Sequence, residues 1–259
     1  MGDPKGQRKS TGSLFRMLEN KLELERKFGV DLVPVRKPEP AAAEPAAPLP
    51  PGGGQGGGPQ GRKSAQVVRG SKAEQLAELE REMANCTECS LASTRTNLVF
   101  GVGSPEADIL FIGEAPGADE DAQGIPFVGR AGQLLTKIIG AMGIRREDVY
   151  IANILKCRPP ENRNPRPTEV VHCLPYIRRQ IAVIRPKVIV CLGGVAAKTL
   201  LQSDMPVGRM RGTFLDYEGI PLIVTFHPAY LLRNPGGKTE VWEDMKRVLH
   251  KLGMPIPKG

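Results

Sequence analysis

A short apolar run followed by a long glycine-rich loop constrains the fold of this chain more than any other stretch. Residues 109–112 read ILFI, a continuous apolar run that suits a strand covered on both faces of a sheet. From Gly113 to Gly132 the chain becomes polar and rich in glycine, and it carries an isolated aromatic residue, Phe127. Glycine permits the close approach of a ligand, and open α/β sheets bind ligands beyond the carboxyl ends of their strands. The loop is therefore predicted to bind a ligand, with a long acidic connection as the alternative.

Strands and helices alternate along the following part of the chain. Strand-like composition recurs at residues 149–155, 188–192 and 221–226, and helical spacing at residues 72–83, 131–142, 168–184, 193–201 and 238–252. This order predicts an α/β protein, a three-layer α/β/α sandwich around a mainly parallel four-stranded sheet.

The first 70 residues have a different composition. Residues 1–12 are expected to be disordered, residues 13–28 to form a short helix, and the segment from residue 34 to about residue 66, rich in Pro, Ala and Gly, to be a linker. The folded domain is then expected to span residues 71–259. The chain has no run of about 18 apolar residues, and MGDPKGQRKS at its start lacks the apolar core of a secretion signal. We therefore expect a cytoplasmic protein that makes no membrane contact.

Charge and cysteines narrow the class of partner. The net charge is +8, and residues 156–211 hold eleven basic and three acidic residues, an excess consistent with binding a polyanion such as nucleic acid, with a solvated basic face as an equal alternative. Cys86 and Cys89 form a C-x2-C pair, a spacing typical of two thiolates on one metal ion or cluster. Cys191 lies in the apolar run VIVCLG and is expected to be an inert core residue.

Three polar residues follow three of the expected strands. Right-handed parallel connections place the carboxyl ends of these strands on one edge, so Glu114, Asn153 and His227 should lie close together. An Asn amide offers a donor and an acceptor that can read a nucleobase edge, while a His can stabilise negative charge on a leaving group, and Phe127 can stack on a base. The alternatives are a turn role for the Asn and a structural role for the His.

Three longer motifs carry a resemblance to a known family. The segments GEAPGADEDAQGIPFVGRAGQLL, YIANILKCRPPENRNP and HPAYLLRNP resemble those of the family 4 uracil-DNA glycosylases, the iron-sulfur branch of the uracil-DNA glycosylase superfamily. The resemblance covers roughly residues 86–249 and includes four cysteines at matching spacings; nothing before residue 71 takes part.

The resemblance implies a 4Fe-4S cluster bound by Cys86, Cys89, Cys157 and Cys173, and hence an iron-sulfur lobe beside the sandwich. A structural zinc is the alternative, although zinc ribbons generally use two close pairs, and fifteen residues separate Cys157 from Cys173.

The resemblance also implies a uracil pocket. Phe127 would stack on the extruded uracil, Asn153 would read its Watson-Crick edge, and His227 would contact O2. Glu120 occupies the position of a side chain that crowds C5 and excludes thymine. Main-chain amides near Glu114 and Ala115 would complete the pocket.

The chemistry expected of this pocket relies on the leaving group. The best-known branch of the superfamily has an aspartate where this chain has Ala115, so hydrolysis must depend on stabilising the departing uracil anion, chiefly by His227. Glu114 is a candidate for orienting water or the pocket, and with Asn153 it completes the expected catalytic set. A related branch traps uracil covalently through a histidine, and the segment after Cys157 has none, which predicts an enzyme that turns over.

Base flipping assigns a role to the remaining motif residues, because the glycosidic bond is reached only after the nucleotide leaves the stack. Leu231 or Leu232 is expected to fill the vacated space, and Arg233 to hold a phosphate. Three arginines in the proline-rich segment after Cys157 are expected to contact the DNA backbone: Arg158, Arg163 and Arg166. The alternative for this segment is a solvated loop.

The sequence therefore predicts a monomeric uracil-DNA glycosylase that starts base excision repair on single- or double-stranded DNA, with an N-terminal extension that binds another repair or replication protein. Two alternatives come from other classes. One is a non-catalytic iron-sulfur protein that binds DNA or docks a partner. The other is a nucleotide-binding enzyme, although GEAPG lacks the spacing of a dinucleotide or P-loop motif.

Overall fold

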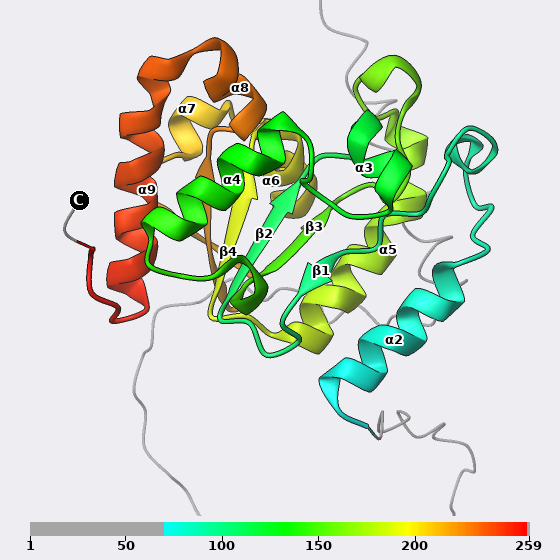
Figure 1. Ribbon diagram of the computed structural model, residues 1–259, viewed down its shortest axis with the longest axis horizontal. Helices are drawn as coiled ribbons and strands as arrows, with labels where there is room; N and C mark the ends of the chain where they lie inside the picture. The colour runs from blue at the N-terminus through cyan, green and yellow to red at the C-terminus, as the bar shows by residue number, and fades with distance from the viewer. Residues whose placement is uncertain (1–69, 258–259) are drawn as a thin grey trace, which may run out of the picture. The chain divides into compact units, whose positions relative to one another are not determined.

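The computed structural model describes residues 70–257, so the predicted helix at residues 13–28 and the predicted linker lie outside the described residues. Its strands are β1 (Val102–Gly103), β2 (Ile109–Gly113), β3 (Tyr150–Asn153), β4 (Val188–Leu192), β5 (Phe214–Tyr217) and β6 (Ile220–Thr225). Its α-helices are α2 (Lys72–Met83), α3 (Ala118–Gln123), α4 (Arg130–Ala141), α5 (Pro167–Ile184), α6 (Gly194–Leu201), α7 (Val207–Met210), α8 (Pro228–Arg233) and α9 (Lys238–Lys251) (Figure 1). Short 3-10 segments occur at Ser90–Ser93, Arg146–Asp148, Pro160–Asn162 and Pro235–Gly237.

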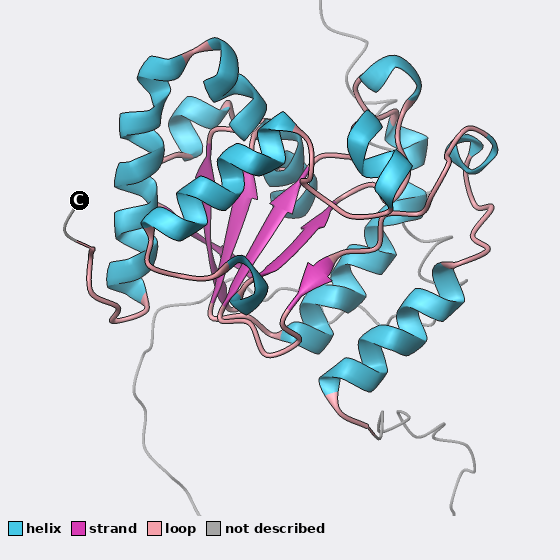
Figure 2. Cartoon of the chain, viewed as in Figure 1, coloured by secondary structure: helices cyan, strands magenta, loops and turns pink. Residues whose placement is uncertain are grey.

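The sheet has six strands in the order β1-β3-β2-β4-β6-β5 (Figure 2). The four central strands, β3, β2, β4 and β6, pair in parallel as predicted. The predicted count of four strands is wrong, because β1 and β5 add an antiparallel edge on each side. β1 has only two residues, and β5 reads FLDY with three of its four residues partly or fully exposed, so neither carries the apolar run of a central strand.

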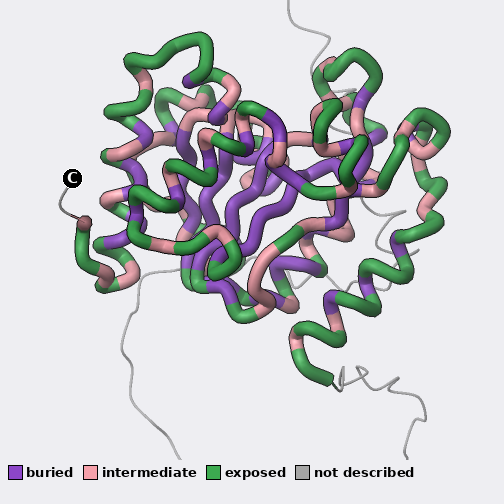
Figure 3. Tube along the Cα trace, in the orientation of Figure 1, coloured by how far each residue is buried: buried purple, intermediate pink, exposed green. Residues whose placement is uncertain are grey.

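Two layers of helices cover the sheet and confirm the sandwich. Alternate strand residues face α2, α5 and α6 on one side and α4, α8 and α9 on the other. Strands β2, β3 and β4 are buried at every position, which matches their continuous apolar sequences (Figure 3). None of the helices within residues 70–257 combines the length and the apolar character that crossing a bilayer would require.

The topology fixes where a site can form. The parallel register pairs Gly113, the last residue of β2, with Asn153, the last residue of β3. On the other side β2 pairs with β4, and β4 with β6, so Thr225 ends its strand at the same edge. The long loops after β2 and β6 therefore leave the sheet together, as predicted for the carboxyl edge of a parallel sheet.

Candidate active site at the carboxyl edge of the sheet

Three residues predicted to contact a base converge at this edge. A Cβ atom added to Gly113 would collide with Asn153 Oδ1 and with the ring of Phe127, so both side chains crowd the end of β2. The ring centroids of Phe127 and His227 lie 5.6 Å apart with their planes inclined by 34°. Residues that are far apart in sequence thus lie together at the end of β2, where only a glycine at position 113 avoids a collision with their side chains.

Phe127 is held in an uncommon conformation. Its φ is +54°, in the left-handed region that a bulky residue rarely adopts, and its side chain is buried. A Cβ at Gly132, in the first turns of α4, would collide with the carbonyl group of Phe127, so the helix packs directly on this backbone. Strained backbone of this kind clusters at ligand sites. The conformation brings the ring of Phe127 next to the end of β2 and to His227.

Asn153 supplies an unsatisfied polar atom. The residue is 1% exposed, and its Oδ1 has no hydrogen-bond partner among the described residues. Leaving a buried acceptor unpaired costs about 1–3 kcal/mol, so such atoms in a folded protein need a reason. A ligand that donates a hydrogen bond at this point would satisfy the atom, and the neighbouring amide nitrogen would donate to an acceptor on the same ligand edge.

His227 has a defined tautomer. It follows β6 and caps α8, and its Nδ1 accepts a hydrogen bond of 3.1 Å from the backbone N–H of Ala229. Burial lowers the pKa of His227 to about 4, with Arg233 contributing to the decrease and Glu120 opposing it. At neutral pH the ring is therefore uncharged, and its single proton lies on Nε2. The side chain is a neutral hydrogen-bond donor.

The two glutamates of the loop differ in their surroundings. Glu114 is half-buried, and burial raises the pKa of its carboxyl group; its backbone carbonyl accepts a hydrogen bond from Leu155 N–H at 3.0 Å. Ala115 beside it is half-buried against the core. The carboxylate of Glu120 accepts hydrogen bonds from the N–H groups of Gly117 at 3.1 Å and of two residues that follow Phe127, each at 2.9 Å: Val128 and Gly129. Sequence reasoning missed these hydrogen bonds, which connect the start of α3 to the backbone beside Phe127.

The four predicted metal ligands lie near one another. Cys157 and Cys173 are buried, whereas Cys86 and Cys89 are half-buried, and all four are free thiols. Burial, with smaller contributions from Cys157 and Cys89, raises the pKa of Cys173 to about 12, which places three of the sulfurs within electrostatic reach. Within residues 70–257, no three His, Cys, Asp or Glu side chains converge closely enough to hold one metal ion.

Two side chains donate hydrogen bonds to these sulfurs. Arg95 donates from Nη1 to Cys157 Sγ at 3.4 Å and to the carbonyl of Cys86 at 2.8 Å. The hydroxyl of Tyr176 lies 3.8 Å from Cys86 Sγ. Donors of this kind suit thiolates that carry negative charge.

The basic residues after Cys157 are less available than their sequence indicates. The guanidinium of Arg163 makes a two-point ion pair with the buried Glu169, at 2.6 and 2.9 Å, and Arg158 donates to Asn162 at 2.8 Å. Lys156, which contributes to the basic excess, is fully buried and donates to a backbone carbonyl and to Gln180. Of the predicted group, Arg166 has an exposed side chain, whose charge helps to lower the pKa of Glu169.

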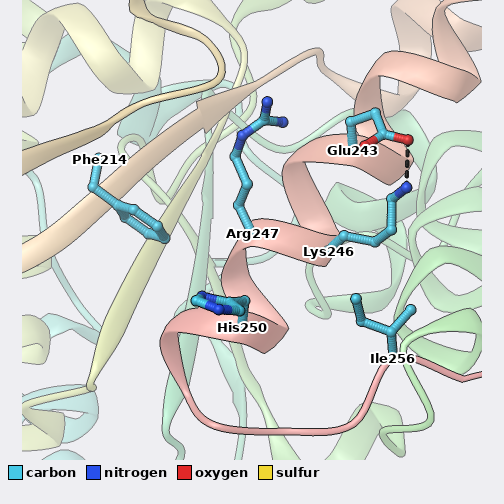
Figure 4. A pocket seen from close by; sticks show the side chains of 6 residues that line it. All are labelled: Phe214, Glu243, Lys246, Arg247, His250 and Ile256. Atoms are coloured by element: carbon cyan, nitrogen blue, oxygen red, sulfur yellow. Dashed lines mark ion pairs between the residues drawn. The ribbon is translucent and has the colours of Figure 1, made fainter.

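The segment after β6 separates its two leucines. Leu231 is buried, whereas Leu232 is 40% exposed, so only Leu232 of the two presents its side chain to solvent. It borders a hollow of 280 Å³ between α4, α8 and the start of α9, which also contains three cations that sequence reasoning missed: Arg130, Lys137 and Lys238. The seven-residue spacing of Arg130 and Lys137 on one helix face was the available signal. A second hollow, of 460 Å³, lies between β5, α9 and Ile256 and contains no predicted site residue (Figure 4).

Comparison with known proteins identifies the family. Residues 100–246 match the model of the uracil DNA glycosylase superfamily. The chain is 44% identical over 192 residues to a type-4 uracil-DNA glycosylase of Archaeoglobus fulgidus, covering 71% of this chain and 96% of that protein. It is 45% identical to the type-4 uracil-DNA glycosylase of Thermotoga maritima, covering 67% of this chain and 93% of the relative. A type-5 uracil-DNA glycosylase of Pyrobaculum aerophilum is less similar, at 29% identity over 53% of this chain and 68% of its own. The chain belongs to the uracil-DNA glycosylase superfamily and, within it, to the type-4 uracil-DNA glycosylases.

Proposed function

We propose that this protein hydrolyses the N-glycosidic bond of uracil flipped out of DNA and leaves an abasic site, the first step of base excision repair. The observation that carries the proposal is the buried, unpaired Oδ1 of Asn153 in the space bounded by Phe127 and a neutral His227. In this proposal the aromatic ring of Phe127 stacks on the face of the uracil ring, the amide of Asn153 pairs with its N3–H and O4, and the neutral imidazole of His227 donates to its O2.

Recognition of uracil rests on the amide of Asn153. Uracil presents a donor, N3–H, beside an acceptor, O4, so Oδ1 accepts from the first while Nδ2 donates to the second. Cytosine presents the opposite pattern, an acceptor beside an amino donor, and would leave both atoms of the amide facing like groups. The ring of Phe127 stacks on the base and excludes water from one face.

Cleavage rests on His227. As the bond breaks, negative charge accumulates on the uracil, and the Nε2–H of His227 donates to O2, where part of that charge develops. The hydrogen bond from Ala229 N–H to Nδ1 holds this tautomer in place. Ala115 offers no carboxylate base, so we propose that Glu114, whose carboxyl pKa is raised by burial, positions the attacking water.

The activity is tested by incubating the full-length protein with matched DNA duplexes that contain uracil or thymine at one position, and with the same strands unpaired. Strand scission after alkaline treatment should appear only with uracil. A protein that binds the DNA without producing abasic sites would point instead to a non-catalytic DNA-binding function. Comparing the two DNA forms measures the preference for single or double strands.

DNA contact is proposed on both sides of the pocket. Leu232 fills the space that the uracil leaves, and Arg233 beside it contacts a phosphate. Arg130, Lys137 and Lys238 extend this positive surface, and Arg158 and Arg166 contact the backbone on the cluster side, while Arg163 mainly holds Glu169 in place. The side chain of Arg163 is 30% exposed, and we propose that this exposed part also contacts the DNA backbone.

We propose that Cys86, Cys89, Cys157 and Cys173 hold a 4Fe-4S cluster. The four thiols lie within electrostatic reach of one another, and 4Fe-4S clusters are held by four cysteine thiolates. The hydrogen bonds from Arg95 and Tyr176 suit charged sulfurs of this kind. When bound, the cluster would supply iron–thiolate bonds to the segment after α2, the loop after β3 and α5.

Replacing Cys157 with alanine should remove the iron and lower the melting temperature of the domain, because metal binding is coupled to folding. Protein purified without oxygen should contain about four irons per chain, measured by metal analysis and visible absorption. Cys191→Ala is the control: this buried cysteine of β4 should leave the iron content unchanged. One zinc and no iron in the wild-type protein would contradict the cluster.

Deleting residues 1–70 should leave uracil excision on short DNA largely intact, since every proposed site residue lies between Cys86 and Lys238. DNA binding at low salt should weaken modestly, because the deleted segment carries a net charge of +5. Single-turnover rates and salt-dependent affinities measure the two effects. A truncated protein that fails to fold would move the domain boundary toward the N-terminus. We further propose that this extension binds another repair or replication protein.

A further inference from the structure

A fully buried carboxylate lies behind the strand that carries His227. Asp244 of α9 is 0% exposed, and its Oδ2 accepts three hydrogen bonds. One comes from the hydroxyl of Thr225 at 2.7 Å, and two come from the guanidinium of Arg211, from Nε at 3.1 Å and Nη2 at 2.9 Å. Removing such a group from water costs several kcal/mol, and a well-packed apolar trio is often as stable or more so. Stability alone therefore gives no reason for this network.

The hydrogen bonding of the Asp244 carboxylate is incomplete. The second oxygen of Asp244, Oδ1, has no hydrogen-bond partner within the described residues, and Arg247 approaches it only to 3.8 Å. All three strong bonds gather on Oδ2, the oxygen that faces the end of β6. This arrangement fixes the end of β6 but does not use the full hydrogen-bonding capacity of the Asp244 carboxylate.

Thr225 is fixed at both its side chain and its backbone. It is the last residue of β6, two positions before His227, and it is fully buried. Its hydroxyl donates to Asp244, and its carbonyl accepts from Gly193 N–H at 2.9 Å. A Cβ at Gly193 would lie 3.2 Å from His227 Cβ, so the same glycine also borders the histidine.

Phe226, between Thr225 and His227, is held by stacking. The guanidinium carbon of Arg211 lies 4.4 Å from the centroid of its ring, and the ring of Tyr230 in α8 packs on it at 4.9 Å. Arg211 thus contacts Asp244 and Phe226 at the same time. The two residues that precede His227 are held by one connected set of side chains.

We infer that Asp244 is a positioning residue for uracil excision, which aims the Nε2–H of His227 through Thr225 and through Arg211 stacked on Phe226. The inference rests on the proposed role of His227. Catalytic donors need to be held within about 0.5 Å and 10–20° of their productive geometry, and a strand end without such anchors would not hold that tolerance.

Thr225→Val tests the anchor, because valine has the shape of threonine and lacks the hydroxyl. In the full-length, cluster-loaded protein, the single-turnover rate of uracil excision should fall roughly tenfold, while the Kd for uracil-containing DNA changes less than about twofold. Thr225→Ser, the matched control, retains the hydroxyl and should stay within about threefold of the wild-type rate. Melting temperature and iron content establish that each variant is folded. If Thr225→Val does not fold, Asp244→Asn takes its place, with the same expected loss of rate.

A double-mutant cycle with His227→Ala separates positioning from general destabilisation. If Thr225 acts through His227, Thr225→Val should slow the His227→Ala protein by less than about twofold, because there is no imidazole left to aim. A full tenfold loss in both backgrounds, or a wild-type rate for Thr225→Val, would overturn the inference. If His227→Ala cleaves at the wild-type rate, the proposed role of His227 in stabilising the leaving group is wrong, and the inference fails with it. If His227→Ala is slow but Thr225→Val cleaves at the wild-type rate, only the inference is rejected.

Discussion

Replacing His227 with alanine is expected to lower the single-turnover rate of uracil excision by about two orders of magnitude, a loss of about 3 kcal/mol of transition-state stabilisation. The reason is that Nε2–H bonds most strongly to O2 when the uracil carries negative charge, so its removal affects the transition state more than the ground state. The Kd for uracil-containing DNA should therefore change far less than the rate. Rapid-quench kinetics with enzyme in excess, together with binding measurements on the same DNA, separate the two quantities.

His250→Ala is the matched control, since His250 is an exposed residue of α9 and should be replaceable without loss of rate. Because burial holds the pKa of His227 at about 4, the wild-type rate should show no ionisation of this ring near pH 6.5. A rate for His227→Ala equal to that of the wild type would make His227 structural.

Asn153→Asp should reduce uracil excision by roughly three orders of magnitude, about 4 kcal/mol, the scale on which a site built for one hydrogen-bond pattern rejects another. The carboxylate would face uracil O4 with a second acceptor and would be buried without a countercharge. Cytosine presents an amino donor at the same position, so slight excision of cytosine should appear. Parallel single-turnover assays on DNA with uracil or cytosine at one position measure both changes.

Asn164→Asp serves as the control for the added negative charge. This exposed residue lies in the basic loop, where the change should weaken DNA binding slightly and leave the preference for uracil over cytosine as it is. An Asn153→Asp protein that excises uracil as fast as the wild type would remove Asn153 from base recognition.

The sequence predicted the central part of the fold because that part is local and repetitive. Strand β4 was predicted with the bounds that it has, and β2, β3 and β6 within two residues at each end, since buried parallel strands read as continuous apolar runs. The edge strands were missed because pairing defines them more than composition does: β1 has two residues, and β5 is held by its turn to β6.

The residues of the candidate site could be predicted from the sequence, whereas the contacts that hold them in place could not. Asn153 ends β3 and His227 follows β6, so topology alone places them on one edge. The left-handed backbone of Phe127 and the hydrogen bonds of Glu120 depend on packing between segments that no periodicity reveals. Asp244 lies in an ordinary amphipathic helix, and its full burial and three hydrogen bonds become visible only in the folded structure.

The order of the strands has a consequence for the newly made chain. Phe127 and Asn153 come from the first half of the sheet, whereas His227 follows β6, which pairs with β4 and not with β2 or β3. A growing chain that had emerged only to the end of β4 would contain the stacking ring and the amide but would have no donor for the leaving group. Domains generally fold as units during synthesis, so such a partial chain is not expected to hold Phe127 and Asn153 in place. The proposed site should therefore be complete only when β6 has paired with β4.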